Sequence, residues 1–138
     1  VDKDTLFKES DLISIHVPKT QLTNNMITLK ELNSMKKDAM LINTSRGGII
    51  NEKDLYKILS KNHLSGVAID VFDNEPYDGP LINFDRCLLT SHMGSMSVDC
   101  RSKMEIEAVE EVIRFIKGEN LLRPVPEEEY LIQNQIKS

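Results

Sequence analysis

The sequence predicts an α/β fold in which a doubly wound parallel sheet is packed between helices in three layers, αβα. Four short apolar runs, rich in β-branched residues, alternate with helical patterns along the 138 residues. Strands that alternate with helices form right-handed βαβ units, and these units build a parallel sheet with helices against it. We expect ligands to bind beyond the carboxyl ends of these strands.

The first half of the chain contains two of the strands and the helix between them. A short amphipathic helix pattern comes first, and residues 12–18, LISIHVP, then form a buried strand that a proline ends. Thr28 and Glu31 form a capping-box pattern, which predicts a helix that ends near Lys36. Residues 39–44, AMLINT, are expected to form the second strand.

The second half continues the same alternation. Two glycines end the second strand, and Asn51 is placed to begin a helix with one apolar face. Residues 66–72, GVAIDVF, and residues 87–92, CLLTSH, form the third and fourth predicted strands. A long final helix carries regularly spaced valines and isoleucines and is expected to stop at Gly118.

Composition and charge exclude several classes of function. A net charge of −5 without a basic patch argues against a protein that binds nucleic acid or anionic membranes. Since no apolar run approaches the roughly 18 residues that cross a bilayer, and the first residues lack a signal-peptide core, we expect a cytoplasmic protein. Cys87 and Cys100 lack close metal-ligand spacing, and the histidines form no local zinc cluster, so no metal site is predicted.

Three candidate catalytic residues follow predicted strands. The guanidinium of Arg46 could bind a carboxylate through two parallel hydrogen bonds, but the RGG segment could also be a turn with a solvated cation. The imidazole of His92 could exchange a proton near neutral pH, although a lone histidine is usually structural. Glu75 could stabilise the protonated form of His92 if the two side chains meet, or it could be an ordinary loop residue.

Asp70 is the most unusual polar residue, because it lies inside the apolar run of the third strand. An unpaired carboxylate would be costly there, so we expect it to have a partner. It could accept a hydrogen bond from a ligand amide, or it could cap neighbouring backbone, and the sequence favours neither. His16 and His63 are expected to be structural or exposed to solvent.

Four segments in order, HVPKT, LINTSRGGIINEKDL, GVAIDVFDNEP and TSHMGS, resemble the successive signature segments of the D-isomer-specific 2-hydroxyacid dehydrogenases. The resemblance runs from about residue 5 to about residue 120. It implies an oxidoreductase with a Rossmann-type domain that transfers a hydride between NAD(H) and a small 2-hydroxy or 2-keto acid. By this resemblance, Arg46 binds the substrate carboxylate and carbonyl, His92 is the general acid and base, and Glu75 binds His92.

The resemblance also implies where the cofactor lies. Asp70 would approach the nicotinamide, and loop residues would line the rest of the cofactor site. The predicted cofactor-binding residues are Val17, Pro18, Thr44, Ser45, Asp70 and Gly94. NADP remains open beside NAD, because the residue that reads the ribose hydroxyl is not in this sequence, and the particular 2-hydroxy acid is also open.

The sequence departs from the family in two respects: it contains no Gly-x-Gly-x-x-Gly fingerprint, and it lacks the separate substrate domain. We therefore expect a partial Rossmann-type sheet, in which residues 1–120 form the carboxy-terminal half of a dinucleotide-binding domain whose glycine-loop half is missing. Residues 121–138 would be a polar tail leading toward the substrate domain. Such a chain is expected to be inactive alone.

The missing half has a structural consequence at one side of the sheet. Without the strand that carries the glycine loop, the strand at residues 12–18 would be an unpaired edge, which another copy of the chain could fill. The tendency of the family to dimerise also favours a homodimer.

Two alternatives compete with the dehydrogenase. A nucleotide-sensing scaffold, similar to the C-terminal-binding-protein corepressors, would keep this fold and much of this site without turnover. The presence of the arginine, the glutamate and the histidine together makes it the weaker prediction. A half-domain that binds no ligand is the other alternative.

Overall fold

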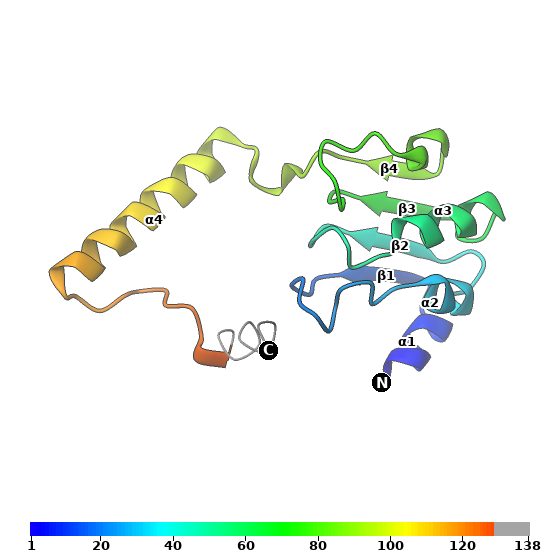
Figure 1. Ribbon diagram of the computed structural model, residues 1–138, viewed down its shortest axis with the longest axis horizontal. Helices are drawn as coiled ribbons and strands as arrows, with labels where there is room; N and C mark the ends of the chain where they lie inside the picture. Colours follow the sequence, from blue (N-terminus) through cyan, green and yellow to red (C-terminus); the bar gives the residue numbers. More distant parts are fainter. Residues whose placement is uncertain (129–138) are drawn as a thin grey trace. The chain divides into compact units, whose positions relative to one another are not determined.

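The computed structural model describes residues 1–128 and contains a single four-stranded sheet within that range (Figure 1). The strands are β1 (Leu12–Ile15), β2 (Met40–Asn43), β3 (Gly66–Ile69) and β4 (Cys87–Leu89). They pair in parallel, in the order β1-β2-β3-β4. The predicted α/β class is therefore confirmed, and each strand begins where the sequence pattern places it or one residue away.

The helices follow the predicted alternation. They are α1 (Lys3–Glu9), α2 (Leu29–Ser34), α3 (Glu52–Ser60) and α4 (Val98–Lys117), with short 3₁₀ helices η1 (Pro80–Asn83) and η2 (Met93–Ser95). The carboxylate of Glu31 accepts the N–H of Thr28 at 2.9 Å, as the capping-box pattern predicts. Gly118 ends α4 with a left-handed backbone (φ +70°), also as predicted.

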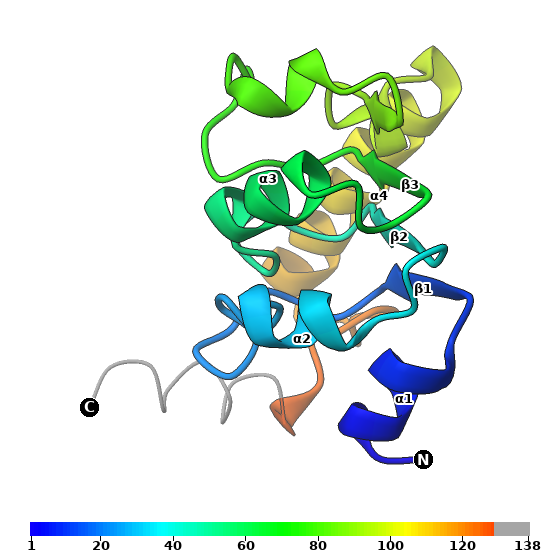
Figure 2. The same ribbon diagram turned by 90° about the vertical axis from the view of Figure 1, so that its right-hand side faces the viewer.

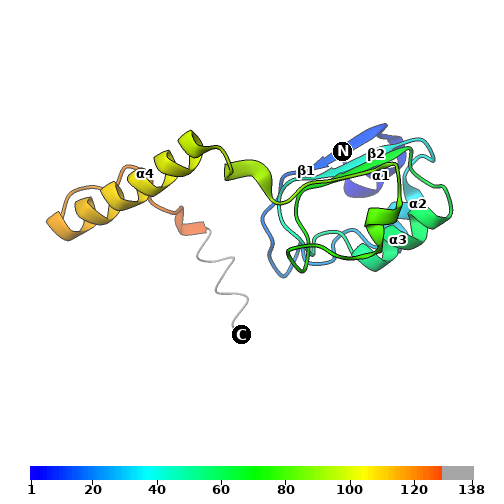
Figure 3. The same cartoon turned by 90° about the horizontal axis from the view of Figure 1, so that it is seen from above.

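One face of the sheet carries the hydrophobic core. Residues alternate along the strands between this face and the opposite one, so that Ile13, Leu41 and Val67 are buried while Leu12 and Met40 are half exposed. The core is completed by apolar side chains from three helices: Phe7, Leu32, Leu55, Ile58 and Leu59. Helix α2 contacts both α1 and α3 (Figure 2), and all three lie on the same side of the sheet (Figure 3).

The second helix layer of the expected αβα arrangement is not formed by residues 1–93. The strand order never reverses, and successive crossovers of the same hand place their helices on the same face of a parallel sheet. Leu12, Met40 and Leu88 consequently remain exposed on the opposite face of this part of the chain. Within residues 1–93, the crossovers between these four strands therefore place helices against one face only.

The chain divides into two compact units, Val1–Met93 and a second unit that begins at Gly94. In the second unit, the apolar side chains of α4 are exposed, and the carboxylate of Glu111 accepts the N–H of Leu122 at 3.0 Å. The division into residues 1–120 and 121–138 stays a prediction, and residues 129–138 lie outside the described residues. Among residues 1–128, no helix is both long and apolar enough to cross a membrane.

Candidate active site

The loops that carry the candidate catalytic residues leave the same edge of the sheet. Because all four strands are parallel, their carboxyl ends lie together. The loop after β2 contains Arg46, the loop after β3 contains Asp70 and Glu75, and the segment after β4 contains His92. Each of these residues belongs to the first compact unit.

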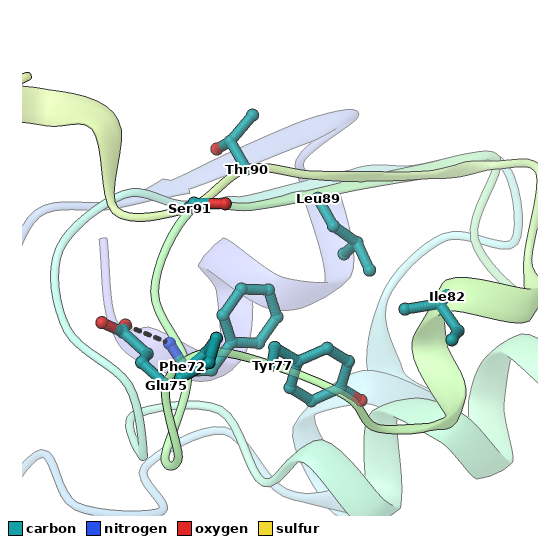
Figure 4. A pocket seen from close by; sticks show the side chains of 8 residues that line it. Phe72, Glu75, Tyr77, Ile82, Leu89, Thr90 and Ser91 are labelled. Atoms are coloured by element: carbon teal, nitrogen blue, oxygen red, sulfur yellow. Dashed lines mark hydrogen bonds between the residues drawn. The ribbon is translucent and has the colours of Figure 1, made fainter.

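The structure brings Glu75 and His92 together. The distance from His92 Nδ1 to Glu75 Oε2 is 3.0 Å, and 47% and 37% of the two side chains is exposed. The other carboxylate oxygen of Glu75 accepts the backbone N–H of Phe72 at 2.9 Å (Figure 4). The hydrogen bond from Phe72, followed by that of His92, lowers the pKa of Glu75, so this side chain is a carboxylate at neutral pH.

His92 has a left-handed backbone, with φ of +55°, which is uncommon for a residue with a side chain. Asp70 holds this conformation from both sides. Its carbonyl oxygen accepts the N–H of His92 at 2.8 Å, and its carboxylate accepts the N–H of Met93 at 2.9 and 3.0 Å. The backbone around His92 is therefore fixed by the residue at the end of β3.

Asp70 thus has the partners that its burial requires. The hydroxyl of Thr90 donates a further hydrogen bond to its carboxylate. Burial alone would raise the pKa of Asp70, but the hydrogen bonds from Thr90 and Met93 lower it below its usual value. These contacts match the alternative in which Asp70 caps neighbouring backbone groups. The contact of Asp70 with a nicotinamide stays a prediction.

Arg46 lies in a turn that buried Asn43 organises. The amide oxygen of Asn43 accepts bonds from the N–H and the hydroxyl of Ser45, at 3.1 and 2.9 Å, and its amide nitrogen donates to the carbonyl of Arg46 at 3.0 Å. The exposed guanidinium of Arg46 donates to the carbonyl of Ser45 at 2.6 Å. Sequence reasoning missed Asn43 as a site residue, although a buried amide inside an apolar run is the same signal that singled out Asp70.

The two glycines after Arg46 allow its turn to pack against the loop that carries Glu75. A Cβ atom at Gly47 would lie 1.9 Å from the carbonyl oxygen of Phe72. Gly48 has φ of +76°, and a Cβ atom there would lie 2.3 Å from Lys19 Nζ. The RGG segment therefore packs closely against both Lys19 and the loop after β3. The contact between Gly47 and Phe72 couples the Arg46 turn to that loop.

The residues predicted to line the cofactor have different surroundings. Val17, Pro18 and Thr44 are exposed in loops at the carboxyl ends of β1 and β2, while the hydroxyl of Ser45 is bound to Asn43. Gly94 begins the second unit, and no atom lies within 4 Å of a Cβ atom built on it. Their contact with a cofactor stays a prediction.

A cavity of about 530 Å³ adjoins Glu75 (Figure 4). Its walls are mostly apolar, and the rings of Phe72 and Tyr77 stack beside it with their centroids 4.2 Å apart. The lining residues are Phe72, Glu75, Pro76, Tyr77, Ile82, Leu89, Thr90 and Ser91. This cavity has no signature in the sequence, because it depends on how the loop after β3 folds back against β4.

The other two histidines, which were expected to be structural or exposed to solvent, have local partners. His16 Nε2 lies 2.8 Å from the hydroxyl of Ser14, and His63 Nε2 lies 3.1 Å from the carbonyl oxygen of Met35. Among residues 1–128, no group of three or more His, Cys, Asp or Glu side chains is arranged to hold a metal ion.

Comparison with known proteins identifies relatives across most of the chain. A family model described as the NAD binding domain of D-isomer specific 2-hydroxyacid dehydrogenases matches residues 1–94. The glyoxylate reductase of Thermococcus litoralis is 43% identical over 120 residues, which are 86% of this chain and 36% of the relative. The D-3-phosphoglycerate dehydrogenase of Escherichia coli is 36% identical over 126 residues, 87% of this chain and 31% of the relative.

Solved structures show the same likeness. The glyoxylate reductase from Paecilomyes thermophila has a TM-score of 0.86 and 36% identity, and the match covers 93% of this chain and 39% of that one. The D-lactate dehydrogenase from Aquifex aeolicus, complexed with NAD and lactic acid, has a TM-score of 0.78 and 28% identity, covering 91% of this chain and 45% of that one. The chain spans about a third of the length of the curated relatives.

Proposed function

The chain belongs to the D-isomer-specific 2-hydroxyacid dehydrogenase family, and we propose that it supplies the catalytic half of the cofactor domain in an NAD-dependent oxidoreductase. The reaction is hydride transfer between NAD(H) and a small 2-hydroxy or 2-keto acid. The observation that carries the proposal is the 3.0 Å contact between His92 Nδ1 and Glu75, at the sheet edge where Arg46 also lies.

His92 and Glu75 form the proton-transfer pair. Because the Nδ1 atom of His92 is bound to Glu75, its Nε2 atom is the one available to a substrate oxygen. In the direction of reduction, the carbonyl carbon gains a hydride and the carbonyl oxygen takes a proton from Nε2. The Glu75 carboxylate stabilises the imidazolium before this step and keeps the ring oriented, and oxidation reverses the same transfers.

Arg46 binds the acid group of the substrate. Its exposed guanidinium presents parallel N–H donors that match a carboxylate, and it also polarises the neighbouring carbonyl. The turn organised by Asn43 sets the position of the Arg46 main chain, while the side chain keeps the freedom to close on a ligand.

The cofactor supplies the hydride when it is bound. Val17, Pro18 and Thr44, exposed at the carboxyl ends of β1 and β2, fit the reacting end of a nicotinamide nucleotide. The diphosphate is expected to bind a glycine loop outside this sequence. Both nucleotides remain candidates, since one structural neighbour carries NAD and another, an acyclic imino acid reductase, carries NADPH.

The names of the relatives point to small 2-keto acids as substrates. Glyoxylate reductases and a hydroxypyruvate reductase are among them, so glyoxylate and hydroxypyruvate are the first compounds to test. We further propose that residues 1–120 are half of the cofactor domain and that residues 121–138 lead to a substrate domain.

A homodimer in the cytoplasm is part of the same proposal. β1 is one of the two outer strands of the sheet formed by residues 1–128, so its outward backbone groups are free to pair with another strand, from the glycine-loop half or from a second copy. The molecular mass of the full-length protein in solution tests the homodimer, and the mass of a monomer would contradict it.

The activity is tested by following NADH absorbance with glyoxylate and hydroxypyruvate in the full-length protein. Arg46→Ala is expected to abolish turnover, while Arg101→Ala, which removes an exposed arginine of α4, is its control. The 138-residue chain alone is expected to be inactive. A folded full-length protein that binds NADH but reduces neither acid would replace the dehydrogenase with the sensing scaffold.

A further inference from the structure

Glu52, the first residue of α3, makes a contact outside its own helix. Its Oε1 atom accepts the backbone N–H of Asp73 at 2.8 Å. Asp73 lies in the loop after β3, two residues before Glu75. The preceding N–H, that of Phe72, donates to Glu75 itself at 2.9 Å. Two successive peptide N–H groups of this loop therefore each donate to a glutamate carboxylate. Phe72 donates to Glu75 of the candidate site, and Asp73 donates to Glu52 of α3.

Neighbouring segments hold the same loop from other sides. The ammonium group of Lys19, which follows β1, lies 3.4 Å from Oδ1 of Asp73. Gly47, which follows β2, leaves no room for a Cβ atom against the carbonyl of Phe72. The loop just before Glu75 is thus held by α3 and by the segments that follow β1 and β2: Glu52 and Gly47 contact its main chain, and Lys19 contacts the side chain of Asp73.

Capping of α3 does not account for Glu52. Asn51 already caps this helix, since its side-chain oxygen accepts the N–H of Asp54 at 3.0 Å. Burial raises the pKa of Glu52, and the nearby Asp73 carboxylate raises it further, although the Asp73 N–H and Lys19 oppose both effects. Burial therefore disfavours the charge of Glu52, and the contact that this carboxylate makes outside α3 is the one with the loop after β3.

We infer that Glu52 is a positioning residue for the Glu75–His92 pair. By holding the main chain at Asp73, it fixes the distance at which the Glu75 carboxylate meets His92 Nδ1. The inference rests on the proposed function for its catalytic meaning, while the positioning itself concerns only the geometry of the loop.

The test compares Glu52→Ala, Glu52→Gln and a matched control in the full-length protein. Glu52→Ala is expected to lower kcat/KM for glyoxylate roughly tenfold to a hundredfold, mainly through kcat, because small displacements of a catalytic group have large effects. Glu52→Gln keeps an oxygen that can accept the Asp73 N–H, so it is expected to restore most of the activity. Glu31→Ala removes another helix-start glutamate that accepts a backbone N–H, away from the site, and is expected to leave kcat/KM unchanged.

A second measurement does not depend on turnover. In protein labelled with ¹³C at the glutamate carboxyl groups, Glu52→Ala is expected to raise the pKa of Glu75 toward its ordinary value, because the Phe72 N–H and His92 no longer meet it well. Glu31→Ala is expected to leave that pKa where it is. If Glu52→Ala does not fold, Glu52→Asp, whose shorter side chain keeps the charge but not the reach, takes its place.

Two results would overturn the inference. One is a Glu52→Ala protein with the kcat/KM and the Glu75 titration of the wild type. The other is an equal change in both quantities for Glu31→Ala, which would show a general loss of structure. If the wild type reduces no 2-keto acid, the proposed function fails, whereas the Glu75 titration still decides the role of Glu52.

Discussion

The two sides of the candidate site differ in how far this chain alone fixes them. On the proton-transfer side, His92 is bound to Glu75 through its ring, and Asp70 holds its backbone in a left-handed conformation. On the acid-binding side, the guanidinium of Arg46 is exposed and donates to the carbonyl of the adjacent Ser45. The proposed proton-transfer pair is therefore already assembled within this chain, whereas the proposed acid-binding arginine is expected to take its final position only on a ligand.

Removal of the imidazole tests this contrast most severely. His92→Ala in the full-length protein is expected to lower kcat for 2-keto acid reduction by roughly 10³, because general acid catalysis is lost, and to change KM little. Steady-state kinetics with NADH measures both values. His63→Ala is the control, since that ring contacts the carbonyl of Met35 and should leave kcat unchanged. A His92→Ala enzyme with nearly normal kcat would assign the proton transfer to another group.

The acid-binding side should respond in KM instead. Arg46→Lys keeps the charge but loses the two parallel donors, so we expect kcat/KM to fall by about 10², largely through a higher KM. The same kinetics with glyoxylate measures the effect. If kcat fell as steeply as in His92→Ala while KM stayed constant, Arg46 would act in the transition state alone and the contrast between the two sides would fail.

The coupling between the two sides is tested at Gly47. In Gly47→Ala, the new Cβ atom would lie 1.9 Å from the Phe72 carbonyl oxygen, so the Arg46 turn and the Glu75 loop must separate. We expect the free energy of unfolding to fall by about 2 kcal/mol from overpacking, and kcat/KM to fall about tenfold. Gly66→Ala is the control, because a Cβ atom there meets its nearest neighbours at 3.9 Å. Urea unfolding and kinetics give both values, and equal behaviour of the two variants would contradict the coupling.

Sequence reasoning reached the proton-transfer side only in part. The alternation of strands and helices places Arg46, Asp70 and His92 at the carboxyl ends of strands, and this follows from local patterns. The contact of Glu75 with His92 depends on the shape of a loop, so it was expected only from the family resemblance, and the bond from Glu52 to Asp73 joins residues that are 21 positions apart. Neither has a periodic signature in the sequence.

The single helix layer of residues 1–93 was also not predictable from local sequence patterns. Each crossover has a predictable hand, but its consequence for the second face depends on whether the strand order reverses. The order β1-β2-β3-β4 cannot be read from four short apolar runs. The expectation of a second layer came from the alternation of strands and helices, which does not fix the strand order, and residues 1–93 do not form that layer.

Substitution of Asp70 is expected to have the smallest effect on stability and activity, and it tests how the backbone at His92 is stabilised. In Asp70→Asn, the amide NH₂ group would face the N–H of Met93, so one of the two carboxylate contacts with that N–H is lost. We expect the free energy of unfolding at neutral pH to fall by about 1 kcal/mol, and kcat to fall a few-fold because the left-handed turn at His92 is loosened. Urea unfolding and steady-state kinetics measure the two changes.

The pH dependence of this difference identifies its origin. The pKa of Asp70 in the folded state lies below its ordinary value of 3.8, so its stabilising contribution is complete above pH 3.8 and is lost as the pH falls through the folded-state pKa. The stability difference between the wild type and Asp70→Asn should therefore be constant at higher pH and shrink in that acidic window, because protonated Asp70 also gives up its charge. A difference that stayed the same at every pH would show that the size or shape of the side chain, rather than its charge, holds the backbone of His92.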